Sequence, residues 1–231
     1  MTSGTNRLKG RDLKKKVSEL LREKDFSSSL DQLASFPGKL VINPLLSFLL
    51  DHDELVKWRA ITAIGVVVSE LAKHDIEAAR VIMRRLMWSL NDESGGIGWG
   101  APEAMGEIMA QCHRLALEYN SILISYLDEE GNFLEYEPLQ KGLIWGIARV
   151  SAKYPELFQS ASRYLPKYLI SEDPSIRGLS AFALAALGTE DGKVLMQNPA
   201  LDDTEFQTFL DGELQKTRVS DLVNKAVSML G

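Results

Sequence analysis

The residue types best suited to recognition chemistry fall on two predicted helices in the middle of the chain. Trp99 and Glu103 lie four residues apart where one helix opens, and Lys141, Trp145 and Arg149 follow at intervals of four on a second helix. Residues at that spacing share one face of a helix. A stripe of cation, aromatic ring and cation can hold an acidic or aromatic group of a binding partner. We therefore predict that these five residues belong to one binding surface.

The stripe also has a structural interpretation, which the sequence leaves open. Its two cations could form ion pairs with carboxylates of adjacent repeats, while Trp145 lies half buried. The carboxylates that could serve in this way are Glu103, Glu107 and Asp173. Glu103 also lies in the first turn of its predicted helix, where the helix dipole favours a carboxylate, so its presence requires no catalytic role.

A glycine-rich stretch precedes the first of these helices. Residues 91–100 read Asn-Asp-Glu-Ser-Gly-Gly-Ile-Gly-Trp-Gly, which is more glycine than a connection between two helices requires. The Gly-x-Gly-x-x-Ala spacing that starts at Gly96 matches a dinucleotide-binding fingerprint, but no strand precedes it and the neighbouring acids would repel a pyrophosphate. The stretch is either a turn that packs Trp99 onto its own hairpin or a loop that contacts a partner. We include the Gly95–Gly100 loop in the predicted binding surface.

Composition and missing motifs exclude several kinds of function. The net charge of −6 lacks the basic excess typical of a general nucleic-acid binder, so nucleic acid is disfavoured as a partner. The single cysteine, Cys112, and three isolated histidines predict no disulfide and no metal site. No nucleophile elbow or P-loop is present, so we assign no catalytic residue and expect no cofactor. No apolar run could span a membrane and no signal peptide is recognised, which predicts a cytoplasmic protein without a membrane partner.

Helical periodicity runs through most of the chain and itself repeats. Apolar and small residues recur at steps of three and four, the period of one helix face, as in Val56, Ala60, Ala63, Ile64, Val67 and Leu71. Prolines near the predicted helix starts agree with this, at positions 44, 102, 138, 155 and 174. The segments that begin at Asp53 and Asp173 are 120 residues apart, and Gly65, Gly106 and Gly146 are separated by 41 and 40 residues. A period of about 40 residues predicts stacked helical hairpins.

The repeat predicts the domain organisation. We expect hairpins over residues 39–73, 74–117, 118–153 and 154–188, after a helical pair at 11–24 and 28–36. The glycines should let neighbouring helices approach closely. Two short runs around Asp211-Gly212 predict a β-hairpin at about 205–218, followed by a helix over 219–230. The chain thus divides into a disordered N-terminus (1–10), a solenoid with its N-terminal helical cap (11–190) and a C-terminal cap (191–231).

One segment carries a resemblance to a known repeat. Residues 173–188, Asp-Pro-Ser-Ile-Arg-Gly-Leu-Ser-Ala-Phe-Ala-Leu-Ala-Ala-Leu-Gly, resemble the second helix of a HEAT repeat and are similar to the HEAT-like repeats of phycobilisome lyases. Residues 95–103 and 142–149 resemble stretches of uncharacterised bacterial HEAT-like proteins. The resemblance covers residues 39–190 and implies an all-α, right-handed α-α superhelix of HEAT-like, armadillo-type repeats. It also implies that Arg177 bonds helix ends between repeats, and we keep Arg177 as a sixth candidate binding residue.

Three functional hypotheses follow. The leading one is a non-catalytic interaction or scaffold module that presents a concave repeat surface to a protein partner. Resemblance to HEAT-like alkylpurine DNA glycosylases, which use concave tryptophans with an acidic residue and arginines, implies an enzyme instead. Resemblance to the lyases implies a chaperone for a tetrapyrrole. A continuous basic groove would favour DNA and a mixed or acidic one a protein, while the partner's identity and the oligomeric state stay open.

Overall fold

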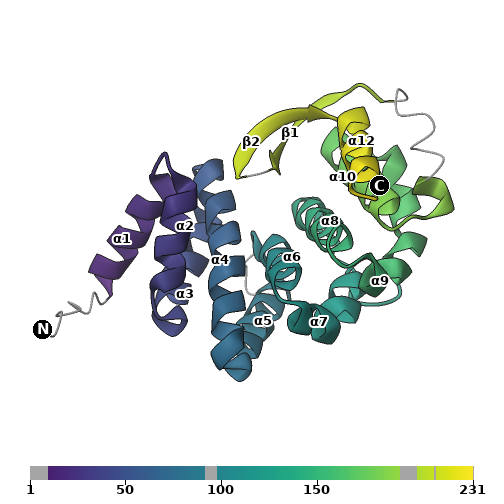
Figure 1. Cartoon of the computed structure of the whole chain (residues 1–231). Coiled ribbons are helices and arrows are strands. Elements are labelled where there is room, and N and C mark those ends of the chain that lie inside the picture. The colour runs from purple at the N-terminus through teal and green to yellow at the C-terminus, as the bar shows by residue number, and fades with distance from the viewer. Residues whose placement is uncertain (1–9, 92–97, 193–201, 211, 231) are drawn as a thin grey trace, which may run out of the picture.

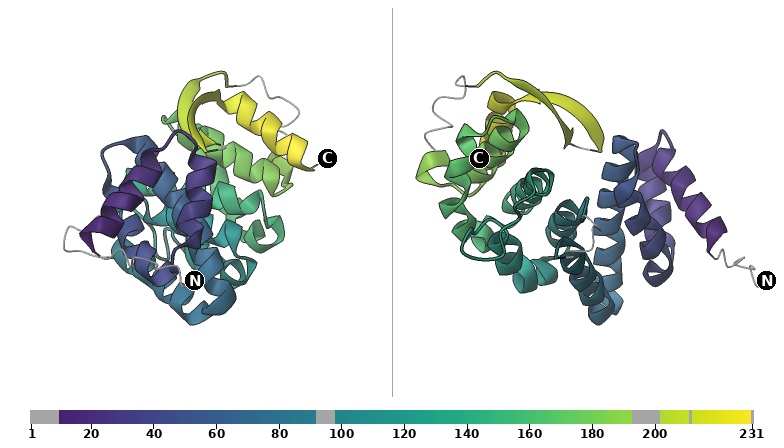
Figure 2. Two further views of the ribbon diagram at one scale, coloured as in Figure 1. Left: turned by 60° about the vertical axis from the view of Figure 1, so that its left-hand side comes forward. Right: turned by 180° about the vertical axis from the view of Figure 1, so that it is seen from behind.

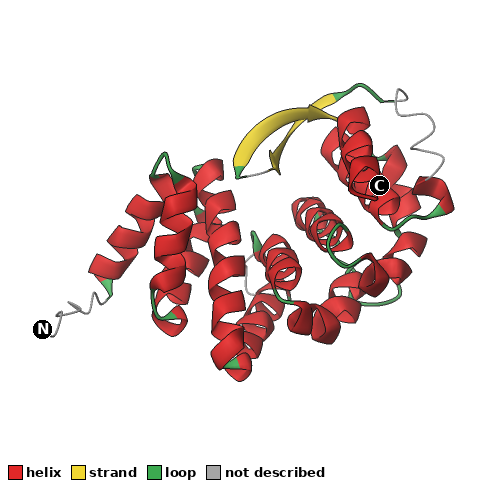
Figure 3. Cartoon of the chain, in the orientation of Figure 1, coloured by secondary structure: helices red, strands yellow, loops and turns green. Residues whose placement is uncertain are grey.

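A computed structural model describes residues 10–91, 98–192, 202–210 and 212–230 of the chain. Within these residues the protein consists of helices and one antiparallel hairpin, β1 (Glu205–Leu210) and β2 (Glu213–Arg218), followed by helix α12 (Val219–Leu230) (Figure 3). The predicted all-α superhelix with a small C-terminal hairpin and helix is therefore confirmed. The expected disorder of residues 1–10 lies, apart from Gly10, outside the described residues.

The helices form two curved layers (Figure 1). In the inner layer each helix packs against the next, in the order α2 (Phe26–Ser35), α4 (Glu54–His74), α6 (Ala101–Gln111), α8 (Glu137–Ser151), α10 (Pro174–Ala186) and α12. The outer layer holds α1 (Arg11–Arg22), α3 (Gly38–Ser47), α5 (Ile76–Leu90), α7 (His113–Ser125) and the short helices α9 (Pro155–Phe158), η2 (Gln159–Arg163) and η3 (Leu165–Ile170), while η1 (Phe48–Leu50) links α3 to α4. Among the described residues, no helix combines the length and the apolar character needed to cross a bilayer.

Side-chain caps and prolines explain where the inner helices begin. Asp53 accepts hydrogen bonds from the backbone N–H groups at the start of α4, and Asp173 accepts one from the N–H of Ser175 at the start of α10. The two aspartates that mark the 120-residue repeat are thus equivalent helix caps. Prolines lie in the first turns of α6, α8, α9 and α10, as the sequence predicted. Pro44 is an exception, because α3 begins at Gly38 and places Pro44 inside the helix.

Glycines allow the inner helices to touch. A Cβ atom on Gly106 of α6 would meet the backbone of Gly146 of α8, with the carbonyl oxygen of Gly146 only 2.8 Å away. A Cβ on Gly65 of α4 would lie 2.6 Å from Cγ of Glu107. Real Cβ atoms do not approach neighbouring groups so closely, so the close approach predicted for these three glycines is confirmed.

The repeat boundaries differ from the predicted ones at one place. Helix α7 begins at His113, directly after Cys112, so the hairpins are α5–α6 and α7–α8 and the boundary lies before residue 113 and not after Leu117. No proline or glycine in the sequence marks the start of α7, since Gln111, Cys112 and His113 join it directly to α6. Periodicity alone therefore placed this boundary too late.

The β-hairpin crosses the concave side of the solenoid (Figures 1 and 2). Its strands pair from Glu205 with Arg218 to Leu210 with Glu213, and Gly212 in the turn has a φ of 87°, a conformation that favours glycine. At the base, Phe206 packs on Gly178 of α10. Its tip reaches across the solenoid, because Phe209 stacks on Trp58 of α4 with ring centroids 5.3 Å apart. The hairpin thus lies over part of the concave surface that the sequence predicted to be open.

Candidate functional site

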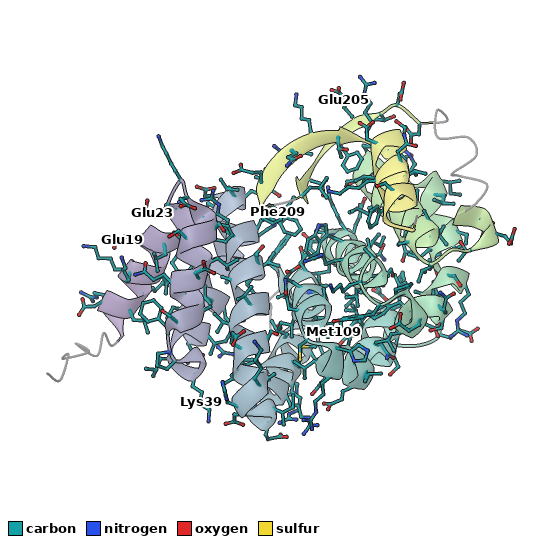
Figure 4. The ribbon with its side chains drawn as sticks, viewed as in Figure 1. Glu19, Glu23, Lys39, Met109, Glu205 and Phe209 are labelled. Atoms are coloured by element: carbon teal, nitrogen blue, oxygen red, sulfur yellow. The ribbon has the colours of Figure 1, made fainter. Side chains whose placement is uncertain are left out.

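An aromatic cluster joins the hairpin to the inner helices. Trp58 of α4 contacts both Trp145 of α8 and Phe209 of β1, with ring centroids 4.8 and 5.3 Å apart. The indole N–H of Trp145 also donates to the carbonyl oxygen of Phe209 at 3.4 Å. Figure 4 shows Phe209 directed from the hairpin toward the helices. Trp145 is only 7% exposed, so it is a buried support for the hairpin and not part of an open stripe.

The cluster separates two cavities on the concave side. The first, which we call the edge cavity, has a volume of about 330 Å³ and is bounded by the first turns of α4, α6, α8 and α10 and by the hairpin. Its lining includes four of the six sequence-predicted residues, Trp99, Glu103, Lys141 and Trp145, together with Trp58. The second, the inner cavity, measures about 260 Å³ and lies on the other side of Trp145. Arg149 lines this inner cavity and is not among the lining residues of the edge cavity.

Helix α6 places one carboxylate at each cavity. Residues 101–110 are all buried, and the charged ones are Glu103 and Glu107, one turn apart on the same face. Glu107 accepts hydrogen bonds from Arg149 at 2.7 and 3.3 Å, and a third from the Gln111 amide at 2.9 Å. The pairing of Arg149 with Glu107 matches the structural interpretation of the stripe. Glu107 is therefore a buried carboxylate with its charge compensated.

Glu103 lacks this compensation. Its carboxyl lies flat against Gly142 of α8, where a Cβ atom would come within 2.6 Å of Oε1. Among the described residues its buried Oε2 has no hydrogen-bond partner. Burial raises the pKa of Glu103, while its own backbone N–H and the charge of Lys57 act in the opposite direction. Gly142 therefore makes room for this carboxyl without supplying a side chain that could pair with it.

Lys141 and Trp99 lie at the mouth of the edge cavity. The Lys141 ammonium is 3.2 Å from the Asp173 carboxylate, a second ion pair that the structural interpretation anticipated. Trp99 is 37% exposed and packs edge to face against Tyr136, with ring centroids 5.6 Å apart. Of the Gly95–Gly100 loop, residues 95–97 lie outside the described residues. Trp99 and Tyr136 thus form an exposed aromatic rim beside the cavity.

Arg177 serves the fold at a different place. Its guanidinium donates to Asp202 Oδ2 and to the carbonyl oxygen of Ser171, both at 2.7 Å, and to the carbonyl oxygen of Glu172 at 3.1 Å. Hydrogen bonding to Arg177 lowers the pKa of Asp202 to about 2. Arg177 therefore ties the segment before the hairpin to the start of α10, which agrees with the helix-end role implied by the HEAT resemblance.

Sequence reasoning missed Trp58 and Phe209 as parts of this site. Trp58 follows Lys57 near the start of α4, where an aromatic residue usually belongs to the core. Phe209 lies 64 residues after Trp145, which it contacts, so no local pattern links them. The available signal was the equivalence of Trp58 and Trp99, which are separated by 41 residues, as are Gly65 and Gly106.

Comparison with known proteins supports the fold. No family model matches the chain. An uncharacterised protein of Archaeoglobus fulgidus is 28% identical over 182 residues, which are 78% of this chain and 91% of that protein. Two engineered proteins of known structure superpose with TM-scores of 0.51, at 17% and 14% identity, over 96% of this chain and 97% and 99% of theirs. At such identities the likeness shows the fold alone.

A third solved structure is a designed armadillo repeat protein in complex with the peptide (KR)4. It is 18% identical to this protein, and the superposition covers 95% of this chain and 100% of the designed chain, with a TM-score of 0.49. The two engineered proteins with TM-scores of 0.51 are consistent with the helical solenoid fold. The finer resemblance to the HEAT-like repeats of phycobilisome lyases stays a prediction.

Proposed function

We propose that the protein is a non-catalytic interaction module that binds a segment of a protein partner at the edge cavity. The observation that carries this proposal is the meeting of Trp99, Glu103 and Lys141 at one cavity of about 330 Å³. Its volume is at the small end for a ligand site, so it suits one or two side chains of a larger partner. The cavity is then the anchor point of a wider interface.

The composition of the site favours a protein over other partners. Aromatic and charged anchors in partly desolvated pockets carry most of the energy of protein interfaces. Trp99 and Tyr136 provide exposed aromatic surface, and Lys141, whose side chain is 46% exposed, provides charge. Trp145, Arg149 and Arg177 act indirectly in this proposal, because their side chains hold the hairpin, Glu107 and the start of α10 in place.

A HEAT-like DNA glycosylase is a second candidate, since a tryptophan and an acid share one cavity. One observation weighs against it. The hairpin occupies the concave side along which a duplex would have to lie. A gel-shift titration with duplex DNA is expected to show no specific binding.

The proposed function is tested by capture from the native cell followed by affinity measurement. Proteins retained by the immobilised chain would be identified by mass spectrometry, and the dissociation constant of each would be measured for Trp99→Ala. We expect Trp99→Ala to weaken binding by roughly tenfold or more, the cost of losing an interface anchor. Because Trp99 is a rim residue, the melting temperature should change little.

Trp88→Ala is the matched control. Trp88 is 83% exposed at the end of α5 and does not line the edge cavity. Its replacement should leave the affinity unchanged. The proposal would be contradicted if Trp99→Ala bound the partner as tightly as the unchanged protein. It would also be contradicted if Trp88→Ala lost as much affinity as Trp99→Ala.

A further inference from the structure

Two carboxylates on one helix face differ in what the chain provides for them. Glu107 receives a guanidinium from Arg149 of α8. One turn back along α6, the carboxyl of Glu103 lies against Gly142 of α8, which has no side chain to pair with it. The fold thus supplies a cation at one position and only a glycine at the other. Glu103 lines the edge cavity, and its Oε2 has no hydrogen-bond partner among the described residues, whereas Glu107 already has its ion pair.

We propose that the edge cavity binds a lysine or arginine side chain of the partner, whose cationic group pairs with Glu103. The proposal rests on the proposed function and names the chemistry that the site recognises. The incoming cation does for Glu103 what Arg149 does for Glu107. Its alkyl stem lies against Trp99, whose ring is partly exposed beside the cavity.

The charges around the cavity favour a cation over an anion. The two lysines in the lining are balanced by acids, since Lys141 pairs with Asp173 at 3.2 Å and Lys57 lies 3.9 Å from Glu54. Of the ionisable residues that line the cavity, Glu103 is the one left outside these two pairs. Further exposed carboxylates lie just before or at the starts of the inner helices, namely Asp53, Glu135, Glu137 and Glu172.

The helix starts at this edge do not offer an anion site in compensation. Asp53 and Asp173 already occupy the backbone N–H groups of α4 and α10. Glu103 itself lies in the first turn of α6, and Glu137 in that of α8. An anionic ligand would therefore meet carboxylates where it needs free N–H donors.

Binding of a cation should depend on pH. Only the ionised form of Glu103 pairs with the ligand, and burial raises the pKa of this carboxyl. Affinity should therefore increase as the pH rises through the raised pKa and then level off. The other charged groups facing Glu103 are Lys57 and Glu54 of α4, Lys141 of α8 and Asp173 at the start of α10. Lys57 lies near Glu54, and Lys141 forms an ion pair with Asp173.

Glu103→Gln is the decisive variant, and its folding can be predicted. The change removes a buried, unpaired acid, so the free energy of unfolding at neutral pH should stay the same or rise. Because the pKa of Glu103 is raised in the folded protein, its contribution to the free energy of unfolding decreases as the pH rises from 4.5 through that raised pKa. Glu103→Gln should remove this decrease. Glu107→Gln, the same change one turn away, breaks the ion pair with Arg149 and should lower the midpoint of chemical denaturation.

Nuclear magnetic resonance of the tryptophan indoles can test the proposal without knowledge of the partner. The chain has four indole N–H groups. Those of Trp58, Trp99 and Trp145 report on the edge cavity, which these residues line, and that of Trp88, which does not line it, serves as the reference. The probes are the amides of N-acetyl-lysine and N-acetyl-arginine, and their uncharged counterparts are the amides of N-acetyl-norleucine and N-acetyl-citrulline. The cationic probes should shift the Trp99 and Trp145 resonances in a saturable manner and leave Trp88 unchanged.

The expected differences are large enough to decide the question. The neutral probes and the Glu103→Gln protein should bind roughly tenfold more weakly, as expected for a lost charge-assisted hydrogen bond. Glu137→Gln removes an exposed carboxylate from the same edge and should change binding little. Equal binding of cationic and neutral probes, or unchanged binding to Glu103→Gln, would overturn the proposal, as would tighter binding of N-acetyl-glutamate amide. If a partner still depended on Trp99 after such a result, the proposed function would stand and its cationic specificity would fall.

Discussion

Replacing Gly106 by leucine is expected to lower the free energy of unfolding by about 3 kcal/mol, the upper part of the range for overpacked cores. A side chain at this position enters the backbone of Gly146, whose carbonyl oxygen would lie 2.8 Å from the new Cβ. Backbone atoms cannot rotate away as a side chain could, so α6 and α8 must separate. Because α6 is buried along its length, that separation would also disturb its contacts with α4.

Two further variants grade this prediction. At Gly146 a Cβ would lie 2.8 Å from the carbonyl oxygen of Pro102, so Gly146→Leu should cost more than ~1 kcal/mol. At Gly38 the nearest atom is Cβ of Leu71 at 3.3 Å, so a small displacement of α3 relieves the contact and Gly38→Ala should cost much less than Gly106→Leu. Chemical denaturation measures all three. A stable Gly106→Leu protein would show that the helices do not touch there.

The second large effect is expected for Phe209→Ala, which should destabilise the packed hairpin by about 3 kcal/mol or more, as for other buried aromatic residues. A two-stranded hairpin has little stability of its own in water. Phe209 provides its stacking contact with Trp58, and the backbone of Phe209 accepts the indole hydrogen bond of Trp145. The variant should release the tip of the hairpin while the helices remain folded. Amide exchange of β1 and β2 should accelerate more than that of α4 or α8.

Lys216→Ala provides the comparison for the hairpin. Lys216 is an exposed residue of β2 that pairs with Gln207 across the ladder. Its removal leaves the aromatic cluster intact and should leave exchange unchanged. If Phe209→Ala also left exchange unchanged, the aromatic contact would not be what holds the hairpin over the concave side.

The sequence predicted the local elements well because their signals are local. Helix periodicity, the caps at Asp53 and Asp173 and the Asp-Gly turn each lie within a few residues. The contact of Gly106 with Gly146 could also be predicted, because a separation of one repeat places equivalent positions of adjacent repeats side by side. Pro44 shows the limit, because helix α3 continues through a residue that usually marks a start.

The candidate site was predicted only in part, for a physical reason. Four of the six predicted residues line the edge cavity because Trp99 and Glu103 lie at the start of α6, while Lys141 and Trp145 lie on the adjacent helix α8. The hairpin that covers Trp145 could not be read from the repeat, since it follows the repeat in the chain and folds back over it. Trp145 therefore looked like an open anchor and is a buried support. The absence of a hydrogen-bond partner for Glu103 Oε2 among the described residues likewise depends on tertiary packing, which places Gly142 of α8 against that carboxyl.

The most direct test of the central claim is hydrogen exchange of the protein with and without a captured partner. The first turns of α6 and α8 begin at Gly100 and Tyr136 without side-chain caps, so their amides should report on an occupant of the edge cavity. We predict slower exchange in these turns and at Trp99 on complex formation, with the outer helices α5 and α7 unchanged. Protection confined to the outer helices, with no change at the edge cavity, would contradict the account.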